Sequence, residues 1–466
     1  MKRTLGVHLL AVAALVSCDS APGPGNSAYR LEVVNEDIWE LVTTERMPPY
    51  VYAGEWHEAR VVSFFPQKHL AVDLWQDGFL DVMVPLIKGY ASGIDTRMPL
   101  LLFKNEGGTL IEASDELVGE LPYIPGLSRS AAFARASDPF HGVFGVQNDT
   151  GDGRFGDAIL IGSGEAPVNR GSRLPTLPLS DDPERPHKVS AHSMAGGDIT
   201  GNDRTDFVVG EWEDEGGGYW LIQEADGTWS VRPDQFLYDV VHVPGNALLD
   251  LHLADLNGNG FDDLIAGYGH GPQESYVFFN DGNGAFSFDD AIPLPGSVYA
   301  PDNSLHLKTI SFDIDGDGDL DLLIVHSRET PYYAGVSLQL LINDGSGTFT
   351  DESSTRMINL PGPDRAFELA AGWSDDYTLI DVNGDGIDDL IGSDELGVRL
   401  WIRSADGVFT EVEIEAEHSK PSAWYTFMDM GDGTVGSLTF RQSWLDAEGT
   451  TNRIWFEQHV LVPPQP

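Results

Sequence analysis

The sequence has a single cysteine, Cys18, so no disulfide can form within one chain. It is also poor in basic residues, with 27 Lys and Arg against 74 Asp and Glu and a formal net charge of −47. This imbalance argues against nucleic acid or an anionic membrane surface as a partner and favours cations. Solubility alone explains many scattered carboxylates, so the clustered ones carry the information.

Several other features are missing. After residue 30 no apolar run is long enough to cross a bilayer. There is no Gly-x-Ser-x-Gly, His-Glu-x-x-His or Walker sequence. Two Gly-x-Gly-x-x-Gly strings, at 151–156 and 431–436, continue into strand-like residues, whereas a dinucleotide site needs a following helix. Common enzyme classes therefore have no sequence support.

The N-terminus has the pattern of an export signal. Lys2 and Arg3 precede an apolar run over residues 5–16, and Leu15-Val-Ser-Cys18 follows. This arrangement resembles a bacterial lipoprotein signal, which implies a cleaved segment 1–17, an acylated Cys18 and a tether over 18–29. A plain secretory signal with an incidental Cys18 is the alternative. We expect a lipid-anchored protein of the cell envelope, with the choice between inner and outer membrane open.

A nonapeptide of the form Asp-x-Asp/Asn-Gly-Asp/Asn-Gly-x-x-Asp recurs along the chain. Near-identical copies begin at Asp255, Asp313 and Asp381, and weaker copies begin at 73, 148, 198 and 428. The mean spacing is about 59 residues, which is typical of a repeat architecture. The chain should therefore be read as about seven equivalent units rather than as several unrelated domains.

A second element keeps step with the first. A turn such as Asn280-Asp-Gly or Asn343-Asp-Gly follows each clear nonapeptide by about 25 to 33 residues, between strand-like runs. Each unit is then a four-stranded antiparallel sheet, and seven such sheets bury their faces by packing around a ring. We predict an all-β, seven-bladed β-propeller over residues 30–466, with strand 29–43 completing the last blade beside 437–444 and 453–460. An eight-bladed ring, with a further blade within 82–147, and two stacked sandwiches are the alternatives.

The repeat resembles a known family. Phe144-Gly145, the following Thr150-Gly-Asp-Gly153 and the run from Ile159 to Pro167 are similar to the FG-GAP and VCBS repeats of integrin α-subunit propellers and bacterial surface proteins. The resemblance covers about residues 65–460. It implies calcium loops between the first two strands of each blade, on the face opposite the one that usually binds partners.

Alternating oxygen side chains suit Ca²⁺, which takes six to eight oxygen ligands. Positions 1, 3, 5 and 9 would bind through side chains and position 7 through its carbonyl. The predicted ligands are Asp255, Asn257, Asn259, Phe261 and Asp263; Asp313, Asp315, Asp317, Asp319 and Asp321; and Asp381, Asn383, Asp385, Ile387 and Asp389. A tentative fourth set is Asp198, Thr200, Asn202 and Asp206. The copies at 73, 148 and 428 have lost ligands, and we expect turns without metal there.

An EF-hand is excluded, since position 12 of the three strong copies is Ala266, Ile324 or Gly392 rather than Glu, and the flanks are strand-like. Magnesium is disfavoured because a cage made wholly of protein oxygens suits the larger ion.

Aromatic and titratable residues gather in the expected wide loops and at strand ends. The candidate ligand-binding residues are Trp212, Tyr268, His270, His326, Arg328, Tyr332, Trp373, Trp424 and Trp444. The favoured hypothesis is a calcium-stabilised binding module for a protein or glycan, without catalytic activity. The alternatives are a polysaccharide lyase using His270, His326 and Arg328, and a plain spacer. Membrane contact is expected only through the lipid.

Overall fold

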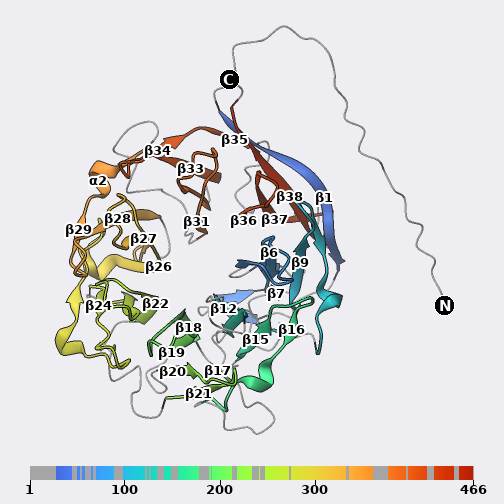
Figure 1. Cartoon of the computed structure of the whole chain (residues 1–466). Helices are drawn as coiled ribbons and strands as arrows, with labels where there is room; N and C mark the ends of the chain where they lie inside the picture. Colours follow the sequence, from blue (N-terminus) through green and yellow to red (C-terminus); the bar gives the residue numbers. More distant parts are fainter. Residues whose placement is uncertain are drawn as a thin grey trace.

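The chain forms a closed ring of seven β-sheets, seen along its axis in Figure 1. The structure is a computed structural model that describes residues 28–44, 50–52, 55–57, 64–66, 70–88, 98–120, 123–124, 127–133, 141–147, 156–177, 188–189, 191–211, 218–232, 241, 247–271, 274–331, 335–359, 376–394, 397–416, 424–445 and 451–464. The predicted seven-bladed β-propeller is therefore confirmed. The eight-bladed alternative is wrong, because residues 82–147 supply strands of blades 1 and 2.

The first three blades each have four antiparallel strands. Blade 1 has β5 (Leu70–Val72), β6 (Asp81–Val84), β9 (Leu101–Asn105) and β10 (Leu110–Glu112). Blade 2 has β12 (Leu127–Phe133), β13 (Gly142–Gln147), β15 (Ile159–Gly162) and β16 (Val168–Asn169). Blade 3 has β18 (Ala191–Gly197), β19 (Asp206–Glu211), β20 (Tyr219–Gln223) and β21 (Trp229–Val231).

The next three blades carry the strong nonapeptides. Blade 4 has β22 (Ala247–Ala254), β23 (Asp263–Gly269), β24 (Tyr276–Phe278) and β25 (Ile292–Pro293). Blade 5 has β26 (Ser304–Phe312), β27 (Asp321–Arg328), β28 (Ser337–Asn343) and β29 (Phe349–Asp351). Blade 6 has β31 (Tyr377–Ile380), β32 (Asp389–Asp394), β33 (Gly397–Arg403) and β34 (Phe409–Val412), with β30 (Met357–Ile358) parallel to β34.

Blade 7 closes the ring with strands from both ends of the chain. It combines β36 (Trp424–Asp429), β37 (Val435–Trp444) and β38 (Asn452–Val462) with the outer strand β1 (Tyr29–Thr43). The antiparallel pairing of β1 with β38 confirms the predicted closure. A short strand, β35 (Ile414–Ala416), runs parallel to the start of β1.

Minor elements lie outside the blades. Four two-stranded pairs are β2 (Tyr50–Tyr52) with β3 (Glu55–His57), β4 (Phe64–Pro66) with β7 (Leu86–Lys88), β8 (Met98–Pro99) with β11 (Tyr123–Ile124), and β14 (Gly156–Asp157) with β17 (Lys188–Val189). The short helices are Ser114–Glu116, Gly171–Arg173, Phe288–Asp290, Pro301–Asn303 and α2 (Ser353–Arg356). No helix within these described ranges has the length and apolar character needed to cross a bilayer.

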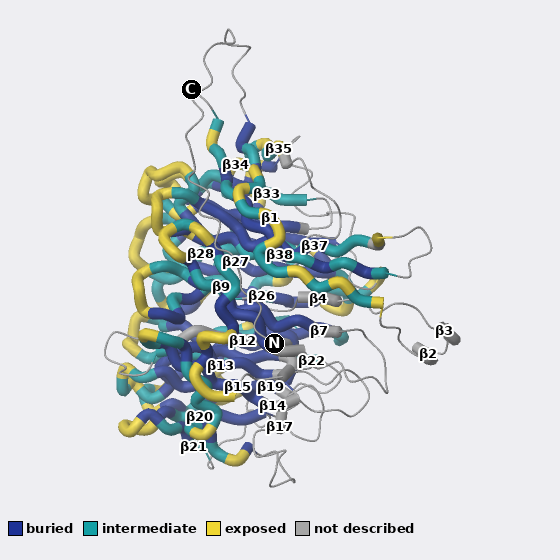
Figure 2. Tube along the Cα trace, turned by 90° about the vertical axis from the view of Figure 1, so that its right-hand side faces the viewer, coloured by how far each residue is buried: buried dark blue, intermediate teal, exposed yellow. Residues whose placement is uncertain are grey.

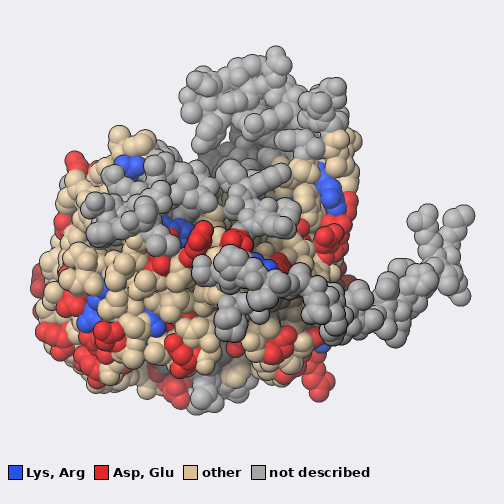
Figure 3. Space-filling model, turned by 90° about the horizontal axis from the view of Figure 1, so that it is seen from above, with Lys and Arg blue, Asp and Glu red and all other residues tan. Residues whose placement is uncertain are grey.

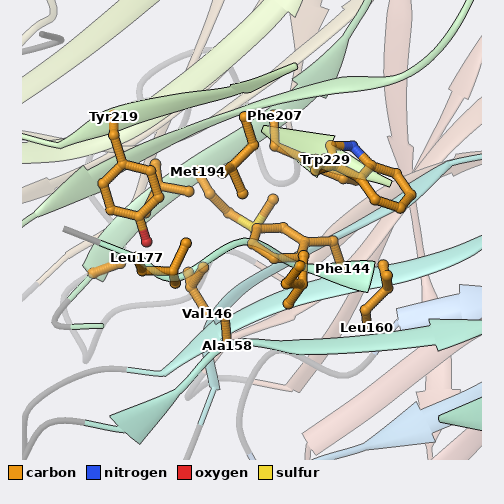
Figure 4. Close-up of a cluster of buried hydrophobic side chains, with 13 residues drawn as sticks. Phe144, Val146, Ala158, Leu160, Leu177, Met194, Phe207, Tyr219 and Trp229 are labelled. Atoms are coloured by element: carbon orange, nitrogen blue, oxygen red, sulfur yellow. The ribbon is translucent and has the colours of Figure 1, made fainter. Parts of the chain in front are cut away.

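Apolar side chains fill the seams between neighbouring blades. Between blades 2 and 3, the rings of Phe144 and Phe207 stack with centroids 4.4 Å apart, and Trp229 packs on Phe207 (Figure 4). Each sheet buries both faces against its neighbours, which explains the long apolar runs in the second strands. Figure 2 shows the consequence: the described strands are largely buried, and many exposed residues lie in loops along one face of the disc, on the left in that view.

Candidate functional site

The three strong nonapeptides connect the first and second strands of blades 4, 5 and 6. In the 313 loop, Asp313 accepts hydrogen bonds from the main-chain N–H groups of Gly316 and Gly318, at 2.6 and 3.1 Å. Both glycines have positive φ, 82° and 96°, which lets the backbone fold around the carboxylates. The 381 loop repeats the pattern, with Asp381 accepting from Gly384 and Gly386. The repeated sequence thus produces a repeated loop geometry.

The 313 loop has the clearest fit to a hard cation. Oxygens of Asp313, Asp315 and Asp317 lie within 4.8 Å of one another. Oδ1 of Asp315 is shielded from solvent and has no hydrogen-bond partner within the described ranges. A buried carboxylate oxygen without a donor is costly, and a bound cation would remove that cost. The donor set of the 313 loop therefore fits Ca²⁺.

The aspartate at position 9 of each loop also has a structural role. Asp321 is fully buried, and its two oxygens accept from the N–H groups of Ile314 and Asn343, at 2.8 and 2.7 Å. The same arrangement occurs at five aspartates, namely Asp81, Asp206, Asp263, Asp321 and Asp389. Burial raises the pKa of Asp321 to about 6 and that of Asp206 to about 7. Each of these carboxylates ties its loop to the third strand of the same blade.

The weaker copy at 198 keeps the fold of the strong loops. Asp198 accepts from the N–H groups of Asn202 and Asp203, and Asp203 takes a positive φ of 60° where the strong copies have glycine. Thr200 directs its hydroxyl to Asp206 at 3.1 Å. The hydroxyl oxygen of Thr200, the expected ligand at position 3, is thus already hydrogen-bonded within the loop.

The copy at 73 replaces ligands with other groups. Trp75 at position 3 is buried, and its indole N–H donates to Glu116 at 2.8 Å. The Lys104 ammonium lies 4.0 Å from Asp77, at position 5. An indole and a protein cation therefore occupy the environment where a metal ion would need oxygens, which agrees with a turn without metal.

The copy at 148 departs from the expected repeat, whereas the copy at 428 lies between the first two strands of its blade, as expected. Residues 148–155 lie outside the described ranges, but their flanking strands β13 and β15 are the second and third strands of blade 2. The interpretation of this segment as an equivalent first loop is therefore wrong. The 428 copy is a tight hairpin between β36 and β37, in which Asp429 accepts from Gly431.

Neighbouring blades are joined at these loops by side-chain amides. Asn343 of blade 5 donates to the carbonyl of Leu256, at position 2 of the blade 4 loop, over 2.7 Å. Asn280 donates in the same way to Ile199, and Asn105 to Met430, at 2.8 and 3.1 Å. In blade 6 a guanidinium replaces the amide, and Arg403 donates to Asp313 and Ile314 carbonyls. The Asn-Asp-Gly turns, which were expected only to form hairpins, therefore also supply side chains that join neighbouring blades.

Seven of the nine candidate ligand-binding residues separate into three groups. Tyr268 and His326 are buried, so their expected role as surface contacts is wrong; the Tyr268 hydroxyl donates to Val241 at 2.6 Å. Trp424 is partly buried against Phe440, with ring centroids 6.0 Å apart. Trp212, Tyr332 and Trp373 lie outside the described residues, as does the side chain of Trp444. Cys18 also lies outside them.

His270 and Arg328 do lie near each other, beside the ends of β23 and β27. His270 forms an ion pair with Glu329, its Nδ1 lying 2.6 Å from the carboxylate, and Arg328 lies over the ring of Tyr299. His326, the third residue of the lyase hypothesis, instead contacts Ser304 and Gln339 through its two ring nitrogens. Only two of the three predicted groups, His270 and Arg328, therefore lie at the surface formed by the loops after the second strands of blades 4 and 5.

Comparison with known families identifies one repeat directly. Residues 255–324, from the blade 4 loop into β27, match the model of the FG-GAP-like repeat. The propeller carries an FG-GAP-like repeat. The matched segment contains two consecutive nonapeptides, those of the 255 and 313 loops. Comparison with curated proteins returns no match.

Solved structures match this chain only at low similarity. The rhamnogalacturonan lyase YesW is 13% identical, with 92% of this chain and 75% of that chain covered and a TM-score of 0.38. A complex of BBS1N with ARL6DN gives 11% identity, 85% and 92% coverage and a TM-score of 0.41. The Trypanosoma rangeli sialidase gives 12% identity, 95% and 59% coverage and a TM-score of 0.36. None of these likenesses carries an activity over to this chain.

Proposed function

We propose that this protein is a calcium-stabilised binding module with three Ca²⁺ loops, at 255, 313 and 381. The observation that carries the calcium assignment is the 313 loop, where three carboxylates converge and one buried oxygen has no donor. The three loops occupy consecutive blades, and the 255 and 313 loops each accept a hydrogen bond from a side chain of the next blade. Bound calcium would therefore stabilise one arc of the ring. The 198 loop is a candidate fourth site.

Calcium should stabilise the folded protein, because a ligand that binds only the folded state raises its melting temperature. The test is thermal melting of residues 19–466 with chelator and with millimolar Ca²⁺, since extracellular calcium modules have dissociation constants of about 10⁻⁴ to 10⁻³ M. Asp317→Asn should reduce the shift. Asp226→Asn removes an equal charge from an exposed turn of blade 3 and should leave the shift unchanged. An identical melting temperature with and without Ca²⁺ would refute the assignment.

The partner surface that we propose is formed by the loops after the second strands of blades 4 and 5, which carry the His270–Glu329 contact and the adjacent Arg328, which lies over Tyr299. A cation over an aromatic ring beside a carboxylate offers both stacking and hydrogen bonding, which suits a protein or glycan ligand. Acidic side chains predominate over basic ones on the rim of the disc that is seen in Figure 3. Acylation of Cys18 would anchor this module to the cell envelope.

Binding can be tested with a glycan array and with envelope extracts, using wild-type protein in Ca²⁺. Arg328→Ala should lose the ligand, while Arg173→Ala, which removes a basic residue from the junction of blades 2 and 3, should retain it. Equal binding by both variants would place the ligand elsewhere.

A carbohydrate-active enzyme is the second candidate. The observation that favours it is the imidazole–carboxylate pair His270–Glu329, an arrangement that can hold a general base. Release of unsaturated sugar from pectic or other acidic polysaccharides, abolished by His270→Ala, would establish this activity. Binding without product release would leave the binding module as the function.

A further inference from the structure

The seam between blades 4 and 5 contains polar side chains as well as apolar ones. Its lower part is apolar, with Leu256, Ile265 and Leu322 among the buried residues. Its upper part holds two buried histidines, His306 on β26 and His326 on β27, and the partly buried His252 on β22. The His306 and His326 rings are 5.3 Å apart between centroids. Two imidazoles thus face each other inside a dry seam.

Neutral groups hold the ring nitrogens of His306 and His326. His306 contacts Ser275 of blade 4 through Nδ1 at 2.9 Å and Thr309 through Nε2 at 2.7 Å. His326 contacts Ser304 through Nδ1 at 3.2 Å and the Gln339 carbonyl oxygen through Nε2 at 2.9 Å. Hydroxyl groups can accept or donate, so this network suits neutral imidazoles. The Ser275–His306 contact joins the two blades directly.

The packing around His306 leaves little room for hydration. A Cβ atom placed on Gly267 of β23 would lie 2.7 Å from the His306 ring, so only glycine fits there. The adjoining cavity, lined by Glu274, Ser297, Tyr299 and both histidines, has a volume of about 20 Å³, enough for about one water. A charged imidazole would therefore have to be stabilised by the protein itself.

Charged and titratable groups face these rings from several elements. Asp250 on β22 has its Oδ2 3.7 Å from His306 Nε2, and Glu274, before β24, lines the cavity. Asp351 on β29 interacts with His326, and Lys308 on β26 with His252. Tyr268 on β23 and Tyr299 in the linker complete the surroundings. The two carboxylates nearest the cavity do not offset burial, because burial lowers the pKa of His252 and His326 to about 4 and that of His306 further.

We propose that the seam between blades 4 and 5 is an acid-sensitive joint, which opens when His306 and His326 become protonated together. Two adjacent positive charges on blade 5, in a seam with room for about one water, require solvation, and separation of blade 5 from blade 4 supplies that water. Opening would break the Ser275–His306 contact and expose the cavity under the wide-loop face. Acidification would thereby alter that face without unfolding the other six seams.

Hydrogen exchange measured by mass spectrometry tests the joint in the full-length mature protein, with chelator present throughout so that metal loss does not contribute. After correction for intrinsic exchange rates, peptides from β22, β26 and β27 should exchange about 10-fold faster or more at pH 4.5 than at pH 7, because the open state takes up protons that the closed state excludes. Peptides from β12 and β18, at the apolar seam of blades 2 and 3, serve as the internal reference and should change less.

His306→Gln and His326→Gln each keep a polar side chain but remove the titrating ring, and each should flatten the pH response at this seam. Variants of His141, a partly buried residue of blade 2 that contacts Gln76, control for the loss of a histidine outside this seam. An equal rise at every seam of the wild type would overturn the joint in favour of general acid instability. If a variant does not fold, the wild-type comparison between seams still decides the outcome.

Discussion

The side-chain amide of Asn343 donates to the main-chain carbonyl of Leu256, 87 residues earlier in the chain and in the neighbouring blade. The same amide donates to Leu320 of its own blade at 3.0 Å. One buried side chain thus fastens a candidate calcium loop to the blade that follows it. The loops are therefore parts of the seams as well as candidate metal sites.

Replacement of Asn343 by alanine should destabilise the protein. Two buried carbonyls, those of Leu256 and Leu320, would lose a donor, and an unsatisfied buried polar group costs about 1–3 kcal/mol. Asn283→Ala is the matched control, because Asn283 is exposed and bonds only to Asp281 in its turn. Urea unfolding in chelator measures both. A cost for Asn343→Ala no larger than that for Asn283→Ala would contradict the fastening role.

Closure of the ring by β1 predicts a second effect. Trp39 of β1 packs on Phe456 of β38, with ring centroids 5.9 Å apart. Trp39→Ala should lower the free energy of unfolding by about 2 kcal/mol or more, since truncating a large aromatic leaves a cavity and exposes its neighbours. Val34→Ala, on the same strand at a side chain that is 56% exposed, should cost far less. Limited proteolysis of the N-terminal strand gives an independent readout, and similar protection in both variants would argue against closure by Trp39.

Local patterns made the blade count and the ring closure predictable. The nonapeptides and Asp-Gly turns mark strand ends because the backbone must take positive φ there, as Gly316 and Gly318 do. Strand 29–43 could be assigned because the last repeat lacked an outer strand. The copy at 148 misled the register, since its composition matches a loop that joins different strands in blade 2.

Contacts between blades could not be read from the sequence. Asn343 opens an Asn-Asp-Gly turn, as Asn280 does, but the turn sequence does not show that its amide reaches another blade. The pairing of His306 with His326 depends on the register of β26 with β27, which places them opposite each other. Burial of Tyr268 and His326 likewise follows from strand packing, which the residue types alone do not encode.

His252 should make the stability of the protein fall in acid. Its ring contacts Ser311 at 2.8 Å, and burial lowers its pKa from 6.5 to about 4. The folded state therefore binds fewer protons than the unfolded state, so stability is complete above about pH 6.5 and declines as the pH falls toward 4, by about 1.4 kcal/mol per unit at most.

His252→Gln should remove this slope, so that the difference in unfolding free energy between wild type and variant shrinks or reverses between pH 6.5 and 4. The buried aspartates act in the opposite direction without metal, because their raised pKa makes the folded state bind more protons. Measuring the difference in chelator cancels that contribution. A difference that is constant with pH would show that folding does not lower the pKa of His252.

Arg356 should oppose calcium at the 313 loop. Its guanidinium lies 3.2 Å from Asp315, where it also bonds Glu352 and the carbonyl of Asp406. In chelator, Arg356→Gln should lower the melting temperature, because the loop carboxylates lose a neutralising charge. In Ca²⁺ the same change should enlarge the calcium-induced shift, because a competing positive charge worth about 1 kcal/mol has gone.

Arg399→Gln, which breaks the Arg399–Glu411 pair away from the loops, should lower the melting temperature without changing that shift. Equal calcium shifts in the two variants would mean that Arg356 only joins blades 5 and 6 and does not influence the metal.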